Sequence, residues 1–250
     1  MDMLELAGVD VGSVVKTLDG YPADSLHETI PNFHNTPDRF RQFTDAMAKN
    51  ASSRLENVRE DCEFVMFREK TCTFLTDLLR AGKLPLRVTH NDTKMSNILF
   101  DKDTGKPVCI IDLDTIMPGL TAYDFGDSIR AGATTAAEDE QDLDKVSFSL
   151  DRFKAYTKGF MQSTFKDGKS FLTPTEAETL SDGAIIMTLE VGMRFLADYL
   201  NGDIYFATKY PEHNLHRARN QFKLVQDMEK MSEEMRSVVM AYYSGNEFKL

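Results

Sequence analysis

Residues 90–97 have the sequence HNDTKMSN, and this stretch decides how the rest of the chain is interpreted. A short β-prone segment, residues 86–89, precedes it. Two apolar segments follow, residues 97–100 and 108–111, and they flank the turn sequence Asp103-Thr104-Gly105-Lys106. Apolar runs on either side of a turn rich in Asp and Gly predict a β-hairpin. We therefore expect residues 90–97 to form a loop between a short strand and a hairpin.

A second polar group lies at the end of the predicted hairpin. The sequence Ile110-Ile111-Asp112-Leu113-Asp114 places Asp112 directly after the second apolar strand and 20 residues after Asp92. Transfer of a phosphoryl group needs a carboxylate to orient the attacking hydroxyl and oxygen ligands to hold Mg²⁺. Carboxylate and amide oxygens suit this hard cation. The pattern therefore predicts a base on the loop, Asp92, and two metal ligands, Asn97 on the loop and Asp112 at the strand end.

The pattern His-x-Asp-x-x-x-x-Asn, followed by an apolar strand that ends in Asp, resembles the aminoglycoside phosphotransferase and choline kinase superfamily, a relative of protein kinases. The resemblance implies ATP as co-substrate and Mg²⁺ as cofactor. It implies that Asp92 is the catalytic base and that Asn97 and Asp112 bind the ion. It also implies that His90 organises the loop and that Lys94 contacts a phosphate.

Other segments are similar to N-acetylhexosamine 1-kinases. These are residues 26–36, LHETIPNFHNT, residues 190–195, EVGMRF, and residues 216–221, HRARNQ. The similarity extends over essentially the whole chain and implies that Arg194 and Tyr205 lie at the site of the sugar. It implies transfer of the γ-phosphoryl group of ATP to a sugar hydroxyl, the anomeric hydroxyl of an N-acetylhexosamine.

Several of these residues have a second interpretation. A strand followed by Asp-x-Asp, as at Asp112 and Asp114, also opens the haloacid dehalogenase phosphatases, in which the first aspartate is a nucleophile. Asp114 is either a further carboxylate of the metal site or a solvated side chain. Glu190 and Arg194 are four residues apart and can form an ion pair within a helix. The resemblance also implies that Asp124 braces the catalytic loop by hydrogen bonds. A chain of this ancestry can also be a non-catalytic module that binds a sugar or a protein.

Composition and charge limit the functional classes. The chain has 250 residues and a formal net charge of −11, so it lacks the basic face that attracts nucleic acids and anionic membranes. The cysteines Cys62, Cys72 and Cys109 form no CxxC pair and no disulfide pattern. The first ten residues include no basic residue, unlike a signal peptide. We therefore expect a cytoplasmic protein whose partners are a nucleotide and a small sugar, with neither nucleic acid nor membrane.

Helical periodicity dominates the remaining sequence. We expect the chain to be helical again after Tyr123, and we expect Thr36-Pro37 to be the N-cap and first residue of another helix. A capping box at Thr173-Pro174-Thr175-Glu176 should begin a further helix. Apolar spacing and these signals predict helices over residues 4–18, 55–80, 173–200 and 215–238, the second of them ending at Gly82. The predicted fold class is therefore mainly α with a small β-hairpin (α+β), a protein-kinase-like C-terminal lobe.

Residues 1–250 are expected to form this single lobe. Kinases of this kind hold the phosphates under a Gly-rich loop of an N-terminal lobe. Before the catalytic loop the only glycines are Gly8, Gly12, Gly20 and Gly82, and they do not form such a loop. We therefore expect that the N-terminal lobe is absent and that the chain alone is not a competent kinase. Self-association or a second chain should then cover the surface that faces the other lobe.

Overall fold

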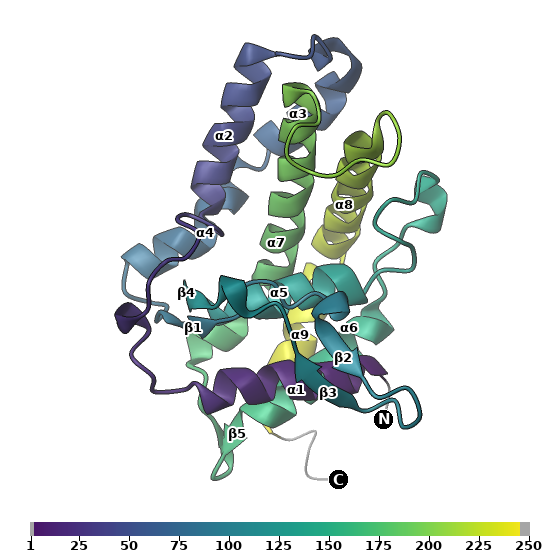
Figure 1. The fold of residues 1–250 in the computed structure, drawn as a ribbon. Coiled ribbons are helices and arrows are strands. Elements are labelled where there is room, and N and C mark those ends of the chain that lie inside the picture. Colours follow the sequence, from purple (N-terminus) through teal and green to yellow (C-terminus); the bar gives the residue numbers. More distant parts are fainter. Residues whose placement is uncertain (1–2, 246–250) are drawn as a thin grey trace.

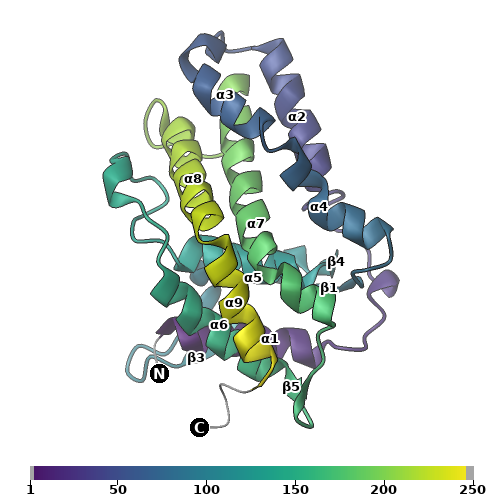
Figure 2. The same cartoon turned by 180° about the vertical axis from the view of Figure 1, so that it is seen from behind.

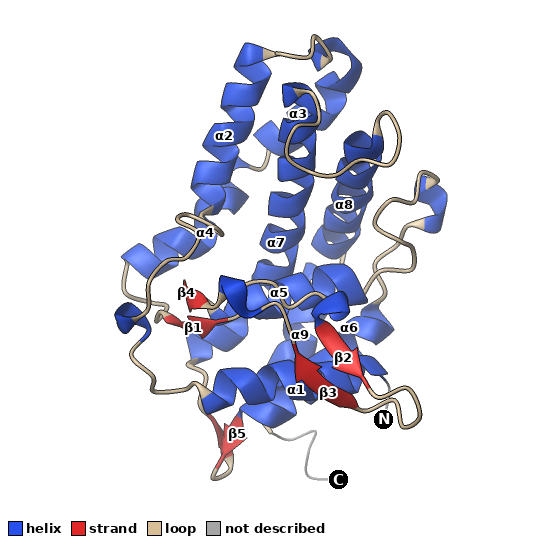
Figure 3. Cartoon of the chain, viewed as in Figure 1, coloured by secondary structure: helices blue, strands red, loops and turns tan. Residues whose placement is uncertain are grey.

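The computed structural model describes residues 3–245 and is built mainly from helices. Figure 3 shows the strands as short red segments among them, which confirms the predicted fold class. Among the described residues, no helix combines the length and the apolar character that a membrane crossing requires. The α-helices are α1 (Met3–Thr17), α2 (Thr36–Lys49), α3 (Arg59–Met66), α4 (Glu69–Arg80), α5 (Thr121–Gly132), α6 (Leu150–Thr164), α7 (Pro174–Asn201), α8 (His213–Lys230) and α9 (Ser232–Tyr243). Short 3-10 turns lie at Ala23–Ser25, Leu55–Val58, Met95–Asn97, Leu113–Thr115 and Leu143–Lys145.

The helix α7 is the central element of the fold. In Figure 1 it runs through the middle of the molecule, and it packs against α2, α5, α8 and α9. The predicted capping box is present at its first turn, where the N–H of Glu176 donates to Thr173 Oγ1 at 3.2 Å and the N–H of Thr173 donates to Glu176 Oε2 at 2.8 Å. Most residues of α7 are buried, so this helix fixes the position of the elements around it.

The strands form three antiparallel pairs within residues 3–245. They are β1 (Arg87–Thr89) with β4 (Met117–Gly119), β2 (Ile98–Phe100) with β3 (Pro107–Ile110), and β5 (Phe165–Lys166) with β6 (Lys169–Ser170). The β2–β3 pair is the predicted hairpin. The pairing of β1 with β4 was not predicted, and it returns the chain after the hairpin to the beginning of the catalytic loop.

Two helices predicted as continuous are broken. The helix predicted over residues 55–80 ends at Met66 and begins again at Glu69. The guanidinium of Arg68 explains this break, because it donates to the Phe64 carbonyl at 2.9 Å and to both carboxylate oxygens of Glu229 on α8. The last helix is interrupted at Met231, and α9 follows α8 after a slight bend in Figure 2. The apolar periodicity continues across this bend because both helices pack on α7.

The beginning of α2 also differs from the prediction by one residue. The N-cap is Asn35, whose side chain accepts from the N–H of Asp38 at 3.2 Å. The hydroxyl of Thr36 is used elsewhere, since it donates to Glu190 Oε2 at 2.6 Å. The buried carboxylate of Glu190 therefore accepts a hydrogen bond from the hydroxyl that the local pattern assigned to capping.

The helix α5 lies unusually close to α7. A Cβ on Gly126 would clash with the carbonyl of Gly183, and a Cβ on Gly183 would clash with the carbonyl of Ala122. Only glycine at both positions allows this approach. The contact fixes α5, and with it Asp124 and Asp127, against the central helix.

The hairpin exposes an apolar surface. Leu99 and Val108 on its strands are 45% and 65% exposed, and Ile111 and Leu113 just after it are 38% and 57% exposed. Large apolar side chains gathered on one small element are a feature of surfaces that another chain segment covers. This surface lies beside Asp112, at the end of the hairpin.

Candidate active site

The catalytic loop begins with a sharp turn at Asn91. The backbone of Asn91 is left-handed, with φ of 64°, a conformation that asparagine tolerates better than most residues. Its side-chain amide donates to the carbonyl of Thr115 at 2.9 Å and accepts from the hydroxyl of Thr89 at 2.9 Å. Both contacts depend on the β1–β4 pairing, because Thr89 ends β1 and Thr115 lies two residues before the beginning of β4. The turn directs Asp92 away from the sheet.

Asp124 on α5 braces this loop from below, as the sequence predicts. Its carboxylate accepts from the N–H of His90 at 2.9 Å and from the N–H of Asn91 at 2.6 Å, and its backbone carbonyl accepts from the hydroxyl of Thr93 at 2.5 Å. Burial raises the pKa of the Asp124 carboxyl to about 6, while the two N–H donors favour its ionised form. The loop is thus attached to a helix that α7 holds in place.

His90 connects the loop to the end of the hairpin. Its Nδ1 accepts from the N–H of Asp92 at 3.3 Å, so the ring hydrogen lies on Nε2, which donates to the carbonyl of Ile111 at 2.9 Å. Ile111 directly precedes Asp112. His90 is buried, and its contacts are those of a residue that positions its neighbours.

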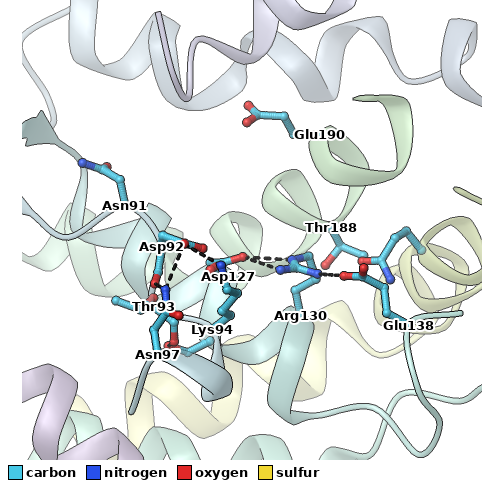
Figure 4. Close-up of polar contacts among 12 residues, drawn as sticks. Asn91, Asp92, Thr93, Lys94, Asn97, Asp127, Arg130, Glu138, Thr188 and Glu190 are labelled. Atoms are coloured by element: carbon cyan, nitrogen blue, oxygen red, sulfur yellow. Dashed lines mark hydrogen bonds and ion pairs between the residues drawn. The ribbon is translucent and has the colours of Figure 1, made fainter. Parts of the chain in front are cut away.

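The predicted base, Asp92, lies beside the predicted metal ligand Asn97 (Figure 4), and the second predicted ligand, Asp112, also contacts Asn97. The amide nitrogen of Asn97 donates to Asp92 Oδ2 at 2.9 Å and contacts Asp112 Oδ2 at 3.4 Å. The ammonium of Lys94 lies 2.6 Å from Asp92 Oδ2. Asp112 has left-handed backbone, with φ of 67°, and an exposed side chain. The loop and the hairpin therefore bring these four side chains to one place.

The chemistry of this donor set fits Mg²⁺. The carboxylate of Asp112 has one long contact with a neighbouring amide, so its oxygens remain accessible to a cation. The amide of Asn97 supplies a second oxygen ligand of the kind that Mg²⁺ prefers. Asp114 is exposed, and the contact described for it is made by its backbone carbonyl, which accepts from the hydroxyl of Thr29 at 2.8 Å. The side chain of Asp112 is exposed as well, so exposure does not distinguish the two interpretations of Asp114.

A cavity of about 630 Å³ opens beside Asp92. Arg194 on α7 and Tyr205, in the loop after α7, both line it, together with Lys94. The structure thus brings the two residues implied as sugar contacts into the same cavity as the predicted base, although they are more than 100 residues away in sequence. Tyr205 is 72% exposed, and its ring packs edge-on against Phe206.

A chain of alternating charges forms one wall of this cavity and was not predicted. Asp127 Oδ1 accepts from Arg130, Arg130 donates to Glu138 Oε2 at 2.8 Å, and Arg217 donates to Glu138 Oε1 at 2.7 Å (Figure 4 shows it from Asp127 to Glu138). Burial opposes the charge of Arg130, but Asp127 and Glu138 raise its pKa above the ordinary value. Charged residues recur at every third position of α5, at Asp124, Asp127 and Arg130. This spacing is the signal in the sequence that could have indicated that they lie on one face of the helix.

Two polar atoms next to the cavity lack hydrogen-bond partners among the described residues. They are Asp127 Oδ2 and Gln221 Oε1. The orientation of the Gln221 amide is fixed, because Asn220 Nδ2 donates to the Ala137 carbonyl and Asn220 Oδ1 accepts from Gln221 Nε2 at 3.1 Å. Both unpaired atoms are therefore acceptors. This wall of the cavity suits a ligand that brings hydrogen-bond donors.

A buried ion pair on the opposite side of the loop was also not predicted. His34 Nδ1 donates to Glu190 Oε1 at 2.7 Å, and His34 Nε2 donates to the Asn91 carbonyl at 2.7 Å. The other Glu190 oxygen accepts from Thr36. Burial opposes the charge of His34, but Glu190 and the two hydrogen bonds raise the pKa of this histidine. Nothing in the local sequence around His34 indicates this contact with the catalytic loop.

These contacts also decide the second interpretation of Arg194. The two Glu190 oxygens bind His34 and Thr36, at the beginning of α2, and no ion pair joins Glu190 to Arg194 in the structure. The guanidinium of Arg194 instead lies 5.6 Å from the ring centroids of Phe33 and of Phe206. It faces the cavity with its charge available.

Comparison with known families supports the interpretation of the loop. The family model described as phosphotransferase enzyme family, APH, matches residues 4–156. This range contains the catalytic loop, the hairpin and α5, and therefore Asp92, Asn97, Asp112 and Asp124. It ends before α7, so the match does not extend to Arg194 or to the loop that carries Tyr205.

Proposed function

Because its residues 4–156 match the family model, the chain belongs to the phosphotransferase enzyme family, and we propose that it transfers the γ-phosphoryl group of ATP to a sugar hydroxyl. The observation that supports this proposal most directly is the position of Asp92. Its carboxylate lies where the large cavity meets Asn97 and Asp112. A carboxylate at this point can accept the proton of an attacking hydroxyl.

We propose that Asn97 and Asp112 hold Mg²⁺ through their side-chain oxygens. When bound, the ion neutralises charge on the transferred phosphate. The chain itself supplies the arrangement of the ligands, since His90 fixes Ile111 and the Asn97 carbonyl accepts from the N–H of Ile111 at 2.9 Å. The ammonium of Lys94, which lies beside Asp92, is placed to interact with a phosphate oxygen when nucleotide is present.

The properties of the cavity support a polyhydroxylated acceptor. Apart from Arg194, its charged lining residues form pairs, and the acceptors Asp127 Oδ2 and Gln221 Oε1 have no hydrogen-bond donor among the described residues. Hydroxyl groups and the N–H of an acetamido group are such donors. Arg194 and Tyr205 offer donors and an aromatic face on another side. We infer that an N-acetylhexosamine is the acceptor and that its anomeric hydroxyl faces Asp92.

The exposed apolar surface of the hairpin supports a role for a second lobe. We propose that residues 1–250 act as one C-terminal lobe and that a nucleotide-binding lobe covers Leu99, Val108 and Ile111 in the active form. Without that cover, Asp92 and the ligands of the ion form only one wall of the nucleotide site. The hairpin surface also favours a second candidate function, in which the lobe binds sugar or a protein partner without turnover.

A sensitive transfer assay distinguishes these functions. Purified chain is incubated with N-acetylglucosamine and about 10 mM Mg-ATP labelled on the γ-phosphate, a concentration above the millimolar dissociation constant expected for one lobe. We expect slow formation of the sugar 1-phosphate, reduced about 10²–10⁴-fold by Asp92→Asn. Asp103→Asn, in the exposed hairpin turn, is the matched control. Equal product from wild type and Asp92→Asn would exclude Asp92 as the base, and sugar binding without any product would favour the binding module.

A further inference from the structure

A second cavity, of about 280 Å³, lies between α2, α7 and the loop that follows α7. Its polar lining residues include Arg39, Gln42, Arg194 and Asn201. Arg194 and Tyr205 also line the larger cavity beside Asp92, so the two cavities share one wall. Two guanidinium groups thus face a small space next to the proposed acceptor site.

Arg39 has only neutral partners. Its Nε and one terminal nitrogen donate to the Phe33 carbonyl at 3.2 Å and 2.9 Å, and the other terminal nitrogen donates to Gln42 Oε1 at 3.1 Å. The residue is half-buried, and burial together with the charge of Arg194 lowers the pKa of Arg39. The charge of the nearby Arg194 therefore repels that of Arg39. Among the described residues, no ion pair involves either guanidinium.

The buried carboxylate of Glu190 does not neutralise these two cations. Glu190 is one turn before Arg194 on α7, but both of its oxygens are bound by His34 and Thr36. Since His34 donates from both ring nitrogens, its own positive charge balances Glu190. The lining of the second cavity thus includes two guanidinium groups and one carboxylate, that of Asp198, so its net charge is positive.

Asp198 also lines the second cavity, but its carboxylate is fully occupied. Its oxygens accept from the backbone N–H groups of Ile204, Tyr205 and Phe206, at 3.0, 2.9 and 2.9 Å, and from Asn214 Nδ2 at 2.9 Å. Four donors leave this carboxylate no free oxygen in the direction of either arginine. It holds the loop in place and thereby shapes the cavity.

We propose that Arg39 and Arg194 form a binding site for a compact oxyanion, a carboxylate, sulfate or phosphate group. Arginine recognises such groups through two parallel N–H donors. The aromatic rings of Phe33 and Phe206 hold Arg194 in place, so little side-chain entropy is lost when an anion binds. The anion is either a substituent of the acceptor that extends past Arg194 or a separate ion. This site does not depend on phosphoryl transfer.

The first test measures inorganic phosphate binding by calorimetry at low salt, without nucleotide or Mg²⁺. The variants are Arg39→Gln, Arg194→Gln and the control Arg41→Gln, whose side chain is on the same helix but pairs with Asp38 and Asp45 at the surface. We expect at least a tenfold loss of phosphate affinity in the first two variants and no change in the control. Equal affinity in all four proteins would overturn the proposal. If Arg39→Gln does not fold, Arg39→Lys keeps the charge and should still weaken binding, because it removes the planar pair of donors.

A second measurement distinguishes the two sources of the anion. Binding of glucuronic acid is compared with binding of glucose in wild type and in Arg39→Gln. A preference for the acid that disappears in Arg39→Gln assigns the oxyanion to the acceptor. Phosphate binding that depends on Arg39, with no such preference between the sugars, assigns it to a separate ion. Both results support the site, and neither requires the chain to be an active kinase.

Discussion

Removal of the Glu190 carboxylate should destabilise the whole lobe. Glu190 is completely buried, and Glu190→Ala would leave the imidazolium of His34 without its counterion and the hydroxyl of Thr36 without its acceptor. Breaking a buried pair in this way typically costs about 3–5 kcal/mol. With a urea m-value of about 2–3 kcal/mol/M, the unfolding midpoint should fall by roughly 1–2.5 M. Glu178→Ala, at an exposed position of α7, should change the free energy of unfolding by less than about 0.5 kcal/mol.

The pH dependence of this difference tests the charge of His34. The pKa of His34 is raised above 6.5, so its contribution to stability is complete below pH 6.5 and disappears as the pH rises through the folded-state pKa. The pKa of Glu190 is lowered below 4.5, despite its burial, because of His34, so its contribution is complete above pH 4.5 and disappears as the pH falls through the lowered pKa. Urea titrations of wild type and variant should therefore differ most between pH 4.5 and 6.5. A difference that stays constant from pH 5 to 9 would refute an ionic pair.

The remaining predictions concern ligands. Asp112→Ala should abolish Mg²⁺-dependent nucleotide binding in calorimetry, whereas Asp114→Ala should weaken it only slightly, because Asp112 is the one of the two that contacts Asn97. The reverse order would exchange their roles. Arg194→Ala should weaken N-acetylhexosamine binding and leave nucleotide binding intact, and unchanged sugar affinity in a folded variant would remove Arg194 from the acceptor site. The chain of 250 residues alone should bind ATP no more tightly than about millimolar, roughly −4 kcal/mol, and micromolar affinity with steady turnover would show that a second lobe is dispensable.

The parts of the fold and site that could be predicted are those with local signals. The hairpin follows from two apolar strands around an Asp- and Gly-rich turn, and the beginning of α7 follows from a capping box whose two hydrogen bonds are both formed. The loop residues Asp92 and Asn97 lie within six residues of each other, so their type and spacing already specified a common site. Asp112 was found because the hairpin returns the chain to the loop.

The residues that could not be predicted act through contacts distant in sequence. His34 reaches the catalytic loop only because α2 and α7 pack together, which places Glu190 beside it. The break between α3 and α4 depends on Glu229 of α8, a partner that no local pattern around Arg68 reveals. In each case a long-range polar partner overrides the local preference of the chain.

The distribution of buried contacts in the site indicates which parts are ready for catalysis. The carbonyl and N–H groups just before Asp92 are held by α5 through Asp124 and by α7 through Glu190 and His34, so the base is positioned without any ligand. Asp112, by contrast, is exposed; its carboxylate has one long amide contact, and its neighbour Ile111 is bound by His90 and by the Asn97 carbonyl. Positioning is the main source of rate acceleration in phosphoryl transfer. We therefore expect the loop that carries Asp92 to be preorganised within this lobe, and we expect the position of Asp112 to depend more on the ligands that bind beside it.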